Sequence, residues 1–250
     1  QKERFLPYGA GVLTAVIFGF SFMFTKLTLP AFGGDIFHML SYRFLLATAV
    51  MGLLWAFRLI RPRYRGKPVG QLFLIGLLQP VLYFICETLG LRLLPSSQAG
   101  LMIALIPVLV TILGAVFLQE KPTWLQTLFI LVSVGGVMAI NLAGGLQGGT
   151  DLVGVALLGG AVLAGAVYNI LSRRASRAFQ PVEVTWLMLC IGAVLFTLIA
   201  WTRIAAQGLP WQSYFAPLRD LRGMLTLTYL SVLSTVAAFF LLNYILSKLE

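Results

Sequence analysis

The sequence predicts an all-α protein that crosses a membrane several times, and three observations lead to this fold class. Hydrophobic residues make up 59% of the 250 residues, and mean hydropathy is +0.93. Charged residues make up only 10%, against roughly 25% in a soluble domain. Apolar stretches of about 20 residues, enough to cross a bilayer, recur along the chain. With so little charge the protein cannot cover its surface in water, so lipid must cover part of it.

Eight apolar stretches are predicted to be membrane helices. Periodicity says little about them, because a helix in lipid is apolar all round. Their length and the proline or glycine clusters between them decide the assignment. The predicted spans are 7–29, 36–59, 69–94, 97–118, 123–142, 152–171, 184–206 and 223–246.

The distribution of lysine and arginine predicts a cytoplasmic N-terminus. In that orientation twelve of the 18 basic residues lie in inside segments, five of them between residues 58 and 67. Only four, Arg92, Arg203, Arg219 and Arg222, lie in outside loops. Cytoplasmic loops are enriched in basic residues. The same rule accounts for the net charge of +10 without nucleic-acid binding.

A weak internal repeat suggests two units of opposite orientation. Gly19 precedes Gly165 by 146 residues, and the segment 89–94 corresponds to 244–249 at an offset of 155. A first unit of five spans forces the second to enter from the opposite side, which is an inverted repeat. We therefore expect repeat units at 1–143 and 144–250. Ten helices are expected and eight are present, so the second unit would be truncated before helices 9 and 10.

Several motifs are similar to those of a known family. The N-terminal half carries Phe18–Gly19 with Lys26, then Arg43–Phe44, the run from Leu94 to Ala99, Pro107, Glu120–Lys121 and Gly135–Gly136. In this order they resemble the drug/metabolite transporter superfamily, EamA-type. The chain departs from that pattern by lacking the last two helices and by having Ala164 where Phe18 would have a counterpart.

The resemblance implies a ten-helix bundle of two inverted five-helix units around a central cavity that opens to either side in turn. It also implies a transporter for metabolites, amino acids, nucleotide-linked sugars or drugs.

Glu87 is the strongest candidate for a transport role. A carboxylate inside a span costs at least about 2.5 kcal/mol, so it usually faces a cavity or a partner. Gln79, Tyr83 and Glu87 are spaced by four residues and are expected to share one helix face. Because burial favours the protonated form of a carboxyl group, Glu87 can be a proton carrier. The alternative is a structural carboxylate paired with a basic residue.

Arg43 and Lys26 are the candidate partners of Glu87. Arg43 is expected roughly 10 Å below the outer surface, and Glu87 at a similar depth of roughly 9 Å. Arg43 suits a structural ion pair, whereas Lys26 can also reach the surface by extending its side chain.

Other polar residues in the spans are weaker candidates. His38 can be an interfacial residue or a proton relay. Asn169 and Asn243 can bond other helices or line a cavity. Pro80 and Pro107 are expected to break spans 3 and 4, at points where transporters place cavities or hinges.

No other function class has comparable support. The chain has one histidine and lacks H-E-x-x-H, G-x-S-x-G and P-loop motifs, so we expect no enzyme, metal or cofactor. The sequence favours a transporter of a small solute by alternating access, with proton coupling as an option, in a prokaryotic plasma membrane. A passive facilitator or channel and a structural membrane subunit remain alternatives. The substrate, the direction of transport and the oligomeric state are left open.

Overall fold

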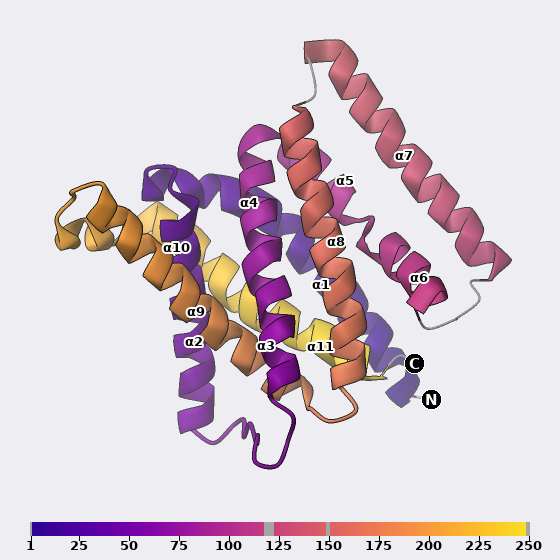
Figure 1. Ribbon diagram of the computed structural model, residues 1–250, viewed down its shortest axis with the longest axis horizontal. Helices are drawn as coiled ribbons and strands as arrows, with labels where there is room; N and C mark the ends of the chain where they lie inside the picture. The colour runs from indigo at the N-terminus through magenta and orange to yellow at the C-terminus, as the bar shows by residue number, and fades with distance from the viewer. Residues whose placement is uncertain (1, 118–122, 149–150, 249–250) are drawn as a thin grey trace. The chain divides into compact units, whose positions relative to one another are not determined.

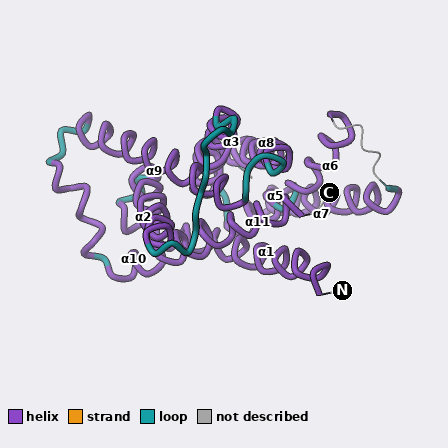
Figure 2. The backbone as a smooth tube through the Cα atoms, turned by 90° about the horizontal axis from the view of Figure 1, so that it is seen from below, coloured by secondary structure: helices purple, strands orange, loops and turns teal. Residues whose placement is uncertain are grey.

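The computed structural model describes residues 2–117, 123–148 and 151–248, which form helices, turns and loops without a strand among them (Figures 1 and 2). Seven helical segments of this part are long and apolar enough to span a membrane, which confirms the predicted fold class. They are Leu6–Phe32, Ile36–Ala56, Gly70–Leu93, Ser96–Val116, Leu152–Ala175, Pro181–Ala206 and Leu221–Lys248. The motif Glu120–Lys121 lies outside the described residues.

The predicted fifth span falls in helix α7 (Trp124–Gly148), whose apolar part is Ile130–Ala139. The glycine run from Gly144 was expected to end this helix near residue 142, but the helix continues to Gly148. A glycine inside a helix costs about 1 kcal/mol relative to alanine, so it weakens a helix without always ending it.

The chain divides into two compact units. The first comprises Gln1–Val81 and Ser172–Glu250, and the second Leu82–Leu171. The first contains α1 (Lys2–Thr28), η1 (Leu29–Phe32), α2 (Ile36–Ala56), α3 (Gly70–Gly76), most of η2 (Leu77–Leu82), α9 (Pro181–Ala206), η3 (Trp211–Arg219), α10 (Leu221–Thr228), η4 (Tyr229–Ala237) and α11 (Ala238–Lys248). The second contains α4 (Tyr83–Leu93), α5 (Ser96–Ile103), α6 (Ile106–Phe117), α7 and most of α8 (Leu152–Ala175). The repeat units expected at 1–143 and 144–250 are a different division, and they stay a prediction.

Aromatic contacts fill the core of the first unit. Helix α2 packs along α9, where the ring centroids of Phe44 and Phe196 are 5.3 Å apart. Helix α1 packs against α11 and η4, and the ring of Phe24 stacks on that of Tyr229 at 4.1 Å. Aromatic pairs of this kind add about 0.5–1.5 kcal/mol beyond the area they bury.

Helix α1 has the polarity of a helix in lipid. Its buried positions include hydroxyl side chains, namely Thr14, Ser21, Thr25 and Thr28. Its exposed positions carry large apolar side chains, among them Val12, Val16, Phe20 and Leu27. A helix on the surface of a water-soluble protein has the reverse arrangement. Hydroxyls such as Thr14 donate to their own helix backbone, which satisfies them without water.

The third span is interrupted at Gln79. Its backbone angles are φ −142° and ψ 110°, which are extended rather than helical. Pro80 explains this, because a proline disfavours the helical conformation in the residue before it and removes a backbone hydrogen bond. Regular helical spacing therefore does not run from Gln79 to Tyr83. The expectation that Gln79, Tyr83 and Glu87 share one helix face fails at its first member.

The fourth span is interrupted upstream of Pro107. Helix α5 ends at Ile103, and α6 begins at Ile106 with Pro107 as its second residue. Proline is compatible with the first turn of a helix, where an N–H group lacks an intrahelical acceptor. The break therefore precedes Pro107 by about one turn and leaves it at the start of a new helix.

Glycines allow α4 and α8 to pack closely within the second unit. A Cβ atom at Gly90 would lie 2.7 Å from Leu158 Cγ, and one at Gly154 would lie 2.8 Å from Leu94 Cγ. Close approach at small residues is the usual way in which membrane helices associate.

Candidate functional site

Arg43 is the most deeply buried basic side chain among the described residues, at 1% exposure. It projects from α2 toward η4, which lies near the middle of the span Leu221–Lys248. Its Nε atom donates to Thr235 Oγ1 at 2.8 Å, and its Nη2 atom donates to Ser234 Oγ at 3.0 Å. Both hydroxyl residues are fully buried. An intramembrane basic residue is thus joined to hydroxyls of a facing helix.

The hydroxyls belong to a segment of π-helix. In η4 the helix is widened, and the Thr235 hydroxyl donates to the carbonyl of Leu230, five residues earlier, at 2.7 Å. π-Helical turns are rare and frequently occur at functional sites. The sequence predicted no irregularity here, because Tyr229–Ala237 contains neither proline nor glycine.

The break in the third span lies beside the same part of α2. A Cβ atom at Gly192 of α9 would be 2.6 Å from Phe44 Cδ1 and 2.9 Å from Pro80 Cγ. Phe44, which follows Arg43, and Pro80 therefore both pack on Gly192. Gln79, immediately before Pro80, is buried at 5% exposure. Two interrupted membrane helices thus flank α2 at Arg43 and Phe44.

Glu87 and Tyr83 lie in the second unit, on α4. Glu87 is 2% exposed and Tyr83 is 7% exposed, so both are buried within the span Gly70–Leu93. Helix α8 covers this helix: Gly160 lies opposite Cys86, and Gly165 lies opposite Tyr83. Burying an ionisable side chain inside a membrane span costs free energy, and this cost alone makes the residue a functional candidate.

His38 contributes to an aromatic cluster at the start of α2. Its Nε2 atom lies 2.9 Å from the backbone carbonyl oxygen of Tyr214, and the Tyr42 hydroxyl donates to the same oxygen at 2.9 Å. The Tyr214 hydroxyl is hydrogen-bonded to Ser41. Burial raises the pKa of the Tyr214 phenol, while the Ser41 bond acts in the opposite direction. Through these hydrogen bonds His38 and its neighbours link the start of α2 to η3.

Asn243 joins three helices in a buried network. It accepts a hydrogen bond from Ser172 at 2.7 Å and donates to Thr185 Oγ1 at 3.0 Å. Asn169 instead donates to Gly165 O of its own helix at 2.8 Å. Lys26 lies in the last turn of α1, with an exposed side chain. Asn243 therefore bonds other helices, whereas Asn169 bonds within its own helix.

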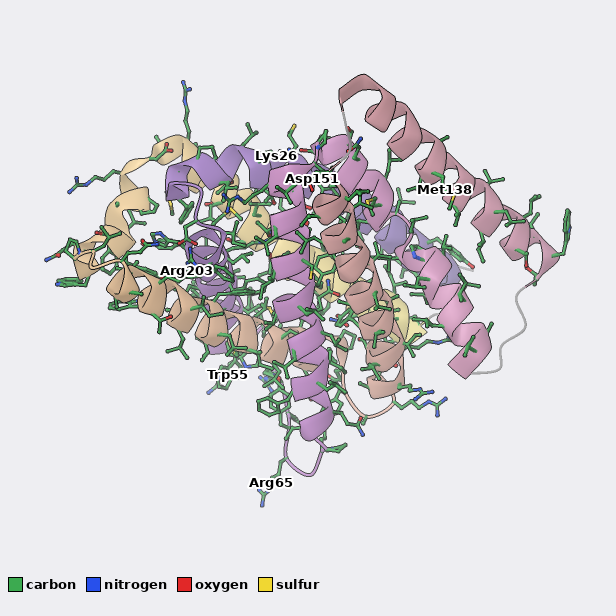
Figure 3. The ribbon with its side chains drawn as sticks, turned by 45° about the horizontal axis from the view of Figure 1, so that its top comes forward. Lys26, Trp55, Arg65, Met138, Asp151 and Arg203 are labelled. Carbon is green, nitrogen blue, oxygen red and sulfur yellow. The ribbon has the colours of Figure 1, made fainter. Side chains whose placement is uncertain are left out.

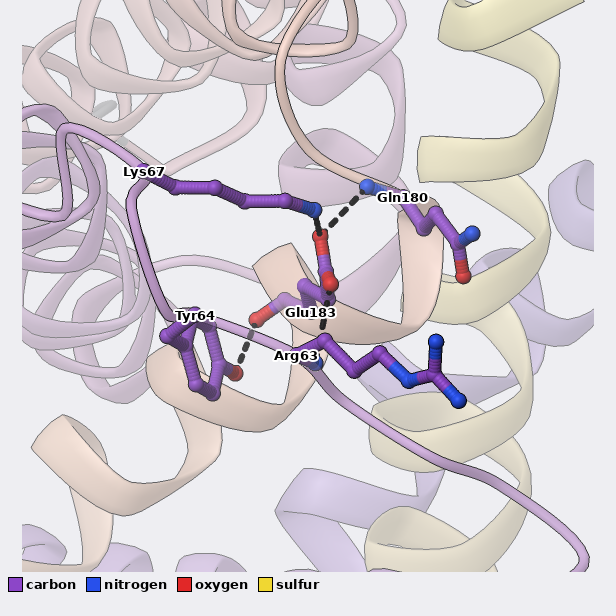
Figure 4. Close-up of polar contacts among 5 residues, drawn as sticks. All are labelled: Arg63, Tyr64, Lys67, Gln180 and Glu183. Carbon is purple, nitrogen blue, oxygen red and sulfur yellow. Dashed lines mark hydrogen bonds and ion pairs between the residues drawn. The ribbon is translucent and has the colours of Figure 1, made fainter.

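Glu183 is a buried carboxylate that the sequence analysis missed (Figure 4). It lies in the first turn of α9, 1% exposed, and accepts from the backbone N–H groups of Gln180 at 2.8 Å and Arg63 at 2.9 Å. Lys67 completes an ion pair with it, and the Tyr64 hydroxyl donates to its backbone carbonyl at 2.8 Å. Burial, with a smaller contribution from the Glu183 charge, raises the pKa of Tyr64.

One sequence signal could have revealed Glu183. A proline at the first helical position with an acidic residue two places later is typical of a helix N-terminus. The structure shows in addition that the loop 57–69 contacts this end of α9 through the residues that bond Glu183. Arg65 projects outward from that loop (Figure 3).

A second ion pair links the other ends of the same two helices. Arg203 near the end of α9 donates to Asp35 Oδ2 at 3.1 Å, and Asp35 also caps α2. Both side chains are partly exposed, so we expect less than about 1 kcal/mol from this pair. Within the described residues no cluster of three metal-ligating side chains occurs.

Comparison with known proteins identifies the family of this membrane protein. The EamA-like transporter family matches residues 6–142 and 152–250, which is nearly the whole chain. The chain belongs to the EamA-like transporter family. As an EamA-like protein it is an integral membrane protein, and its resemblance to that group of transporters is confirmed.

The relatives of this EamA-like chain are transporters by name. An uncharacterized transporter of Bacillus subtilis, YcxC, is 36% identical over 100% of this chain and 80% of its own length. A probable terminal-alkyne amino-acid exporter of Streptantibioticus cattleyicolor is 32% identical over 54% of this chain and 44% of its own length. A solved crystal structure matches with a TM-score of 0.58 and 15% identity, over 96% of this chain and 80% of that one, which shows the fold alone.

Proposed function

We propose that this protein is an alternating-access carrier for a small metabolite, amino acid or drug. The observation that supports it most is the buried contact of Arg43 with Ser234 and Thr235 at a π-helical segment. Buried ionisable residues in spans usually serve a solute or ion pathway. Irregular backbone at membrane depth is tolerated where it is buried in protein or lines a water-filled cavity.

The predicted internal repeat relates the irregular segment beside Arg43 to the break in the third span. At the offset of 155 residues that relates 89–94 to 244–249, Gln79 and Pro80 correspond to Ser234 and Thr235. The two irregular segments, η2 and η4, therefore occupy matching positions in the proposed units. Paired interruptions in the two halves of a transporter are the best sequence pointer to its binding site.

Glu87 is the proposed coupling residue. Its carboxyl group is buried inside a span, and such groups form proton relays in many carriers. In one state of the carrier it would hold a proton, and in the other it would release it. Tyr83, one turn earlier on α4, is proposed as its companion at the solute pathway.

One relative suggests an amino-acid-like solute and export from the cell. It is named as a probable terminal-alkyne amino-acid exporter, and its alignment covers 54% of this chain. We propose a bacterial plasma membrane with the N-terminus in the cytoplasm, because that places the basic loop 58–67 inside.

Reconstitution tests the carrier proposal. The full-length protein in liposomes should take up a solute saturably from a panel of anionic, cationic and neutral compounds, and a proton gradient should drive the uptake above equilibrium. Arg43→Gln should lower the flux, whereas the exposed control Arg222→Gln should leave it unchanged. Uptake no faster than in protein-free liposomes for every compound would refute the proposal, and uptake that never exceeds equilibrium would favour a passive facilitator.

A further inference from the structure

The hydrogen bonds of Arg43 indicate the chemistry of the solute. We propose that the Nε and Nη2 edge of Arg43, together with the Ser234 hydroxyl as a further donor, binds the carboxylate group of the transported solute. This inference rests on the proposed transport function and names its substrate class.

The edge of Arg43 already holds two oxygen atoms in the arrangement that a carboxylate offers. The N–H groups on Nε and Nη2 point the same way, and they form the planar fork that pairs with two carboxylate oxygens. In the structure Thr235 Oγ1 occupies the first position at 2.8 Å and Ser234 Oγ the second at 3.0 Å. Two hydroxyl oxygens therefore stand where the oxygens of a bound carboxylate would lie.

A carboxylate would bind this edge more strongly than the hydroxyls do. A carboxylate pairs with a guanidinium through two parallel hydrogen bonds and carries the opposite charge, whereas the two hydroxyls are neutral acceptors. The low dielectric around a residue that is 1% exposed strengthens the attraction further. The hydroxyls thus keep the edge hydrogen-bonded when no solute is present, and a carboxylate can displace them.

The hydroxyl of Ser234 adds a donor to this site. Ser234 is fully buried and accepts the Arg43 hydrogen bond, and within the described part of the chain its own proton has no acceptor. A serine hydroxyl can donate one hydrogen bond while it accepts another. Thr235 differs, because its proton is given to the Leu230 carbonyl. A carboxylate beside Arg43 would receive the Ser234 proton as a third hydrogen bond.

The π-helical turn provides a way to open the edge. Ser234 and Thr235 face Arg43 while the turn is widened. Regularising η4 to an α-helix would rotate both residues relative to α2 and withdraw their oxygens from the guanidinium. One local change of helix type, from π to α, would then replace the hydroxyls at the Arg43 edge by the carboxylate of the solute.

Uptake of matched compounds tests the inference. The full-length protein in liposomes would be given the twenty amino acids and simple monocarboxylates, each compared with its carboxamide and with the amine that lacks the carboxyl group. We expect at least one carboxylate to be taken up about tenfold or more faster than its amide, the loss that removing charged hydrogen bonds produces.

Variants assign that preference to this site. Arg43→Lys keeps the charge but loses the planar fork, and should raise the KM of the carboxylate about tenfold or more. Ser234→Ala removes the third donor, so it should raise the KM several-fold, and it serves in place of Arg43→Lys if that variant does not fold. Arg222→Gln, on the exposed start of α10, should leave the KM unchanged.

Three results would overturn the inference while leaving the carrier proposal in place. They are equal uptake of carboxylates and amides, preference for phosphate monoesters, and an unchanged KM in both Arg43→Lys and Ser234→Ala. Absence of flux for every anionic, cationic and neutral compound would overturn the carrier proposal as well.

Discussion

Among the described residues, three charged side chains are buried in membrane spans, and their surroundings differ. Glu183 lies in the first turn of α9 and accepts hydrogen bonds from two backbone N–H groups and Lys67. A carboxylate at a helix N-terminus also gains from the helix dipole, which is a structural role. Glu87 and Arg43 lie away from such ends, inside spans. They are the two residues for which we propose a role in transport.

Replacing Glu183 should destabilise the protein without a specific effect on the solute. Glu183→Ala removes a helix cap worth about 1 kcal/mol and a charged hydrogen bond worth about 1.5–3 kcal/mol. We expect a clear fall in Tm, with the KM of the remaining folded protein unchanged. Lys67→Gln should lower Tm less, because the backbone donors to Glu183 remain. Equal Tm values for wild type and Glu183→Ala would contradict this assignment.

Replacing Glu87 should separate accumulation from exchange. Glu87→Gln keeps the shape of the side chain and removes its charge, so the variant should fold and reach the membrane. Proton-driven accumulation in proteoliposomes should be lost, while downhill exchange of labelled solute continues. If Glu87 is instead a structural partner of Arg43, the variant should lose thermal stability and Arg43→Leu should restore it. Wild-type accumulation together with wild-type stability would exclude both roles.

Among the elements, the interrupted helices carry the proposed function. Pro80 made the break in the third span predictable, because proline excludes a helical conformation locally. The π-helical segment η4 has no such residue. Its partner α2 supplies the explanation, since Arg43 bonds two successive residues of the widened turn. The packing of α2 against η2 and α9 then depends on Gly192.

Gly192 should tolerate no side chain, and Gly76 provides a matched control. A Cβ at position 192 would meet the Phe44 ring at 2.6 Å and Pro80 at 2.9 Å, and both are rigid. We expect Gly192→Ala to cost about 1–3 kcal/mol through overpacking. At Gly76 the close atom is Ile191 Cδ1, the flexible end of a side chain, so Gly76→Ala should be nearly neutral. Thermal unfolding in detergent compares the two, and equal Tm values would disprove the packing argument.

At the scale of the whole molecule, orientation in the bilayer is the main prediction. Helices α2 and α9 are antiparallel, so Asp35 and Arg203 meet at one end, while Arg63 and Glu183 meet at the other. The basic loop 58–67 belongs to the second of these ends. The positive-inside rule therefore predicts that this loop lies in the cytoplasm.

Cysteine labelling in intact cells tests this orientation. In a background with Cys86→Ala and Cys190→Ala, a cysteine that replaces the exposed Gln212 should react with an impermeant reagent. Arg63→Cys should react only after the membrane is permeabilised. Labelling of position 63 from outside would reverse the orientation.

The sequence by itself determined the membrane class, the helical fold, most of the span positions and the family resemblance. These follow from local properties: a bilayer requires about 20 apolar residues per helix, and proline or glycine acts on its immediate neighbours. It also singled out Arg43 and Glu87, because a charge in an apolar stretch is visible without any knowledge of its surroundings.

Only the tertiary structure decided what these residues touch. The donors and acceptors at Arg43 are 191 and 192 residues apart in the chain, and those at Glu183 include Arg63, 120 residues away. Serine and threonine are common in membrane helices, where they usually bond their own backbone, so nothing local marks Ser234 and Thr235 as partners of a guanidinium. Their role follows from the packing of α2 on η4, which places a buried fork of donors opposite two hydroxyl oxygens.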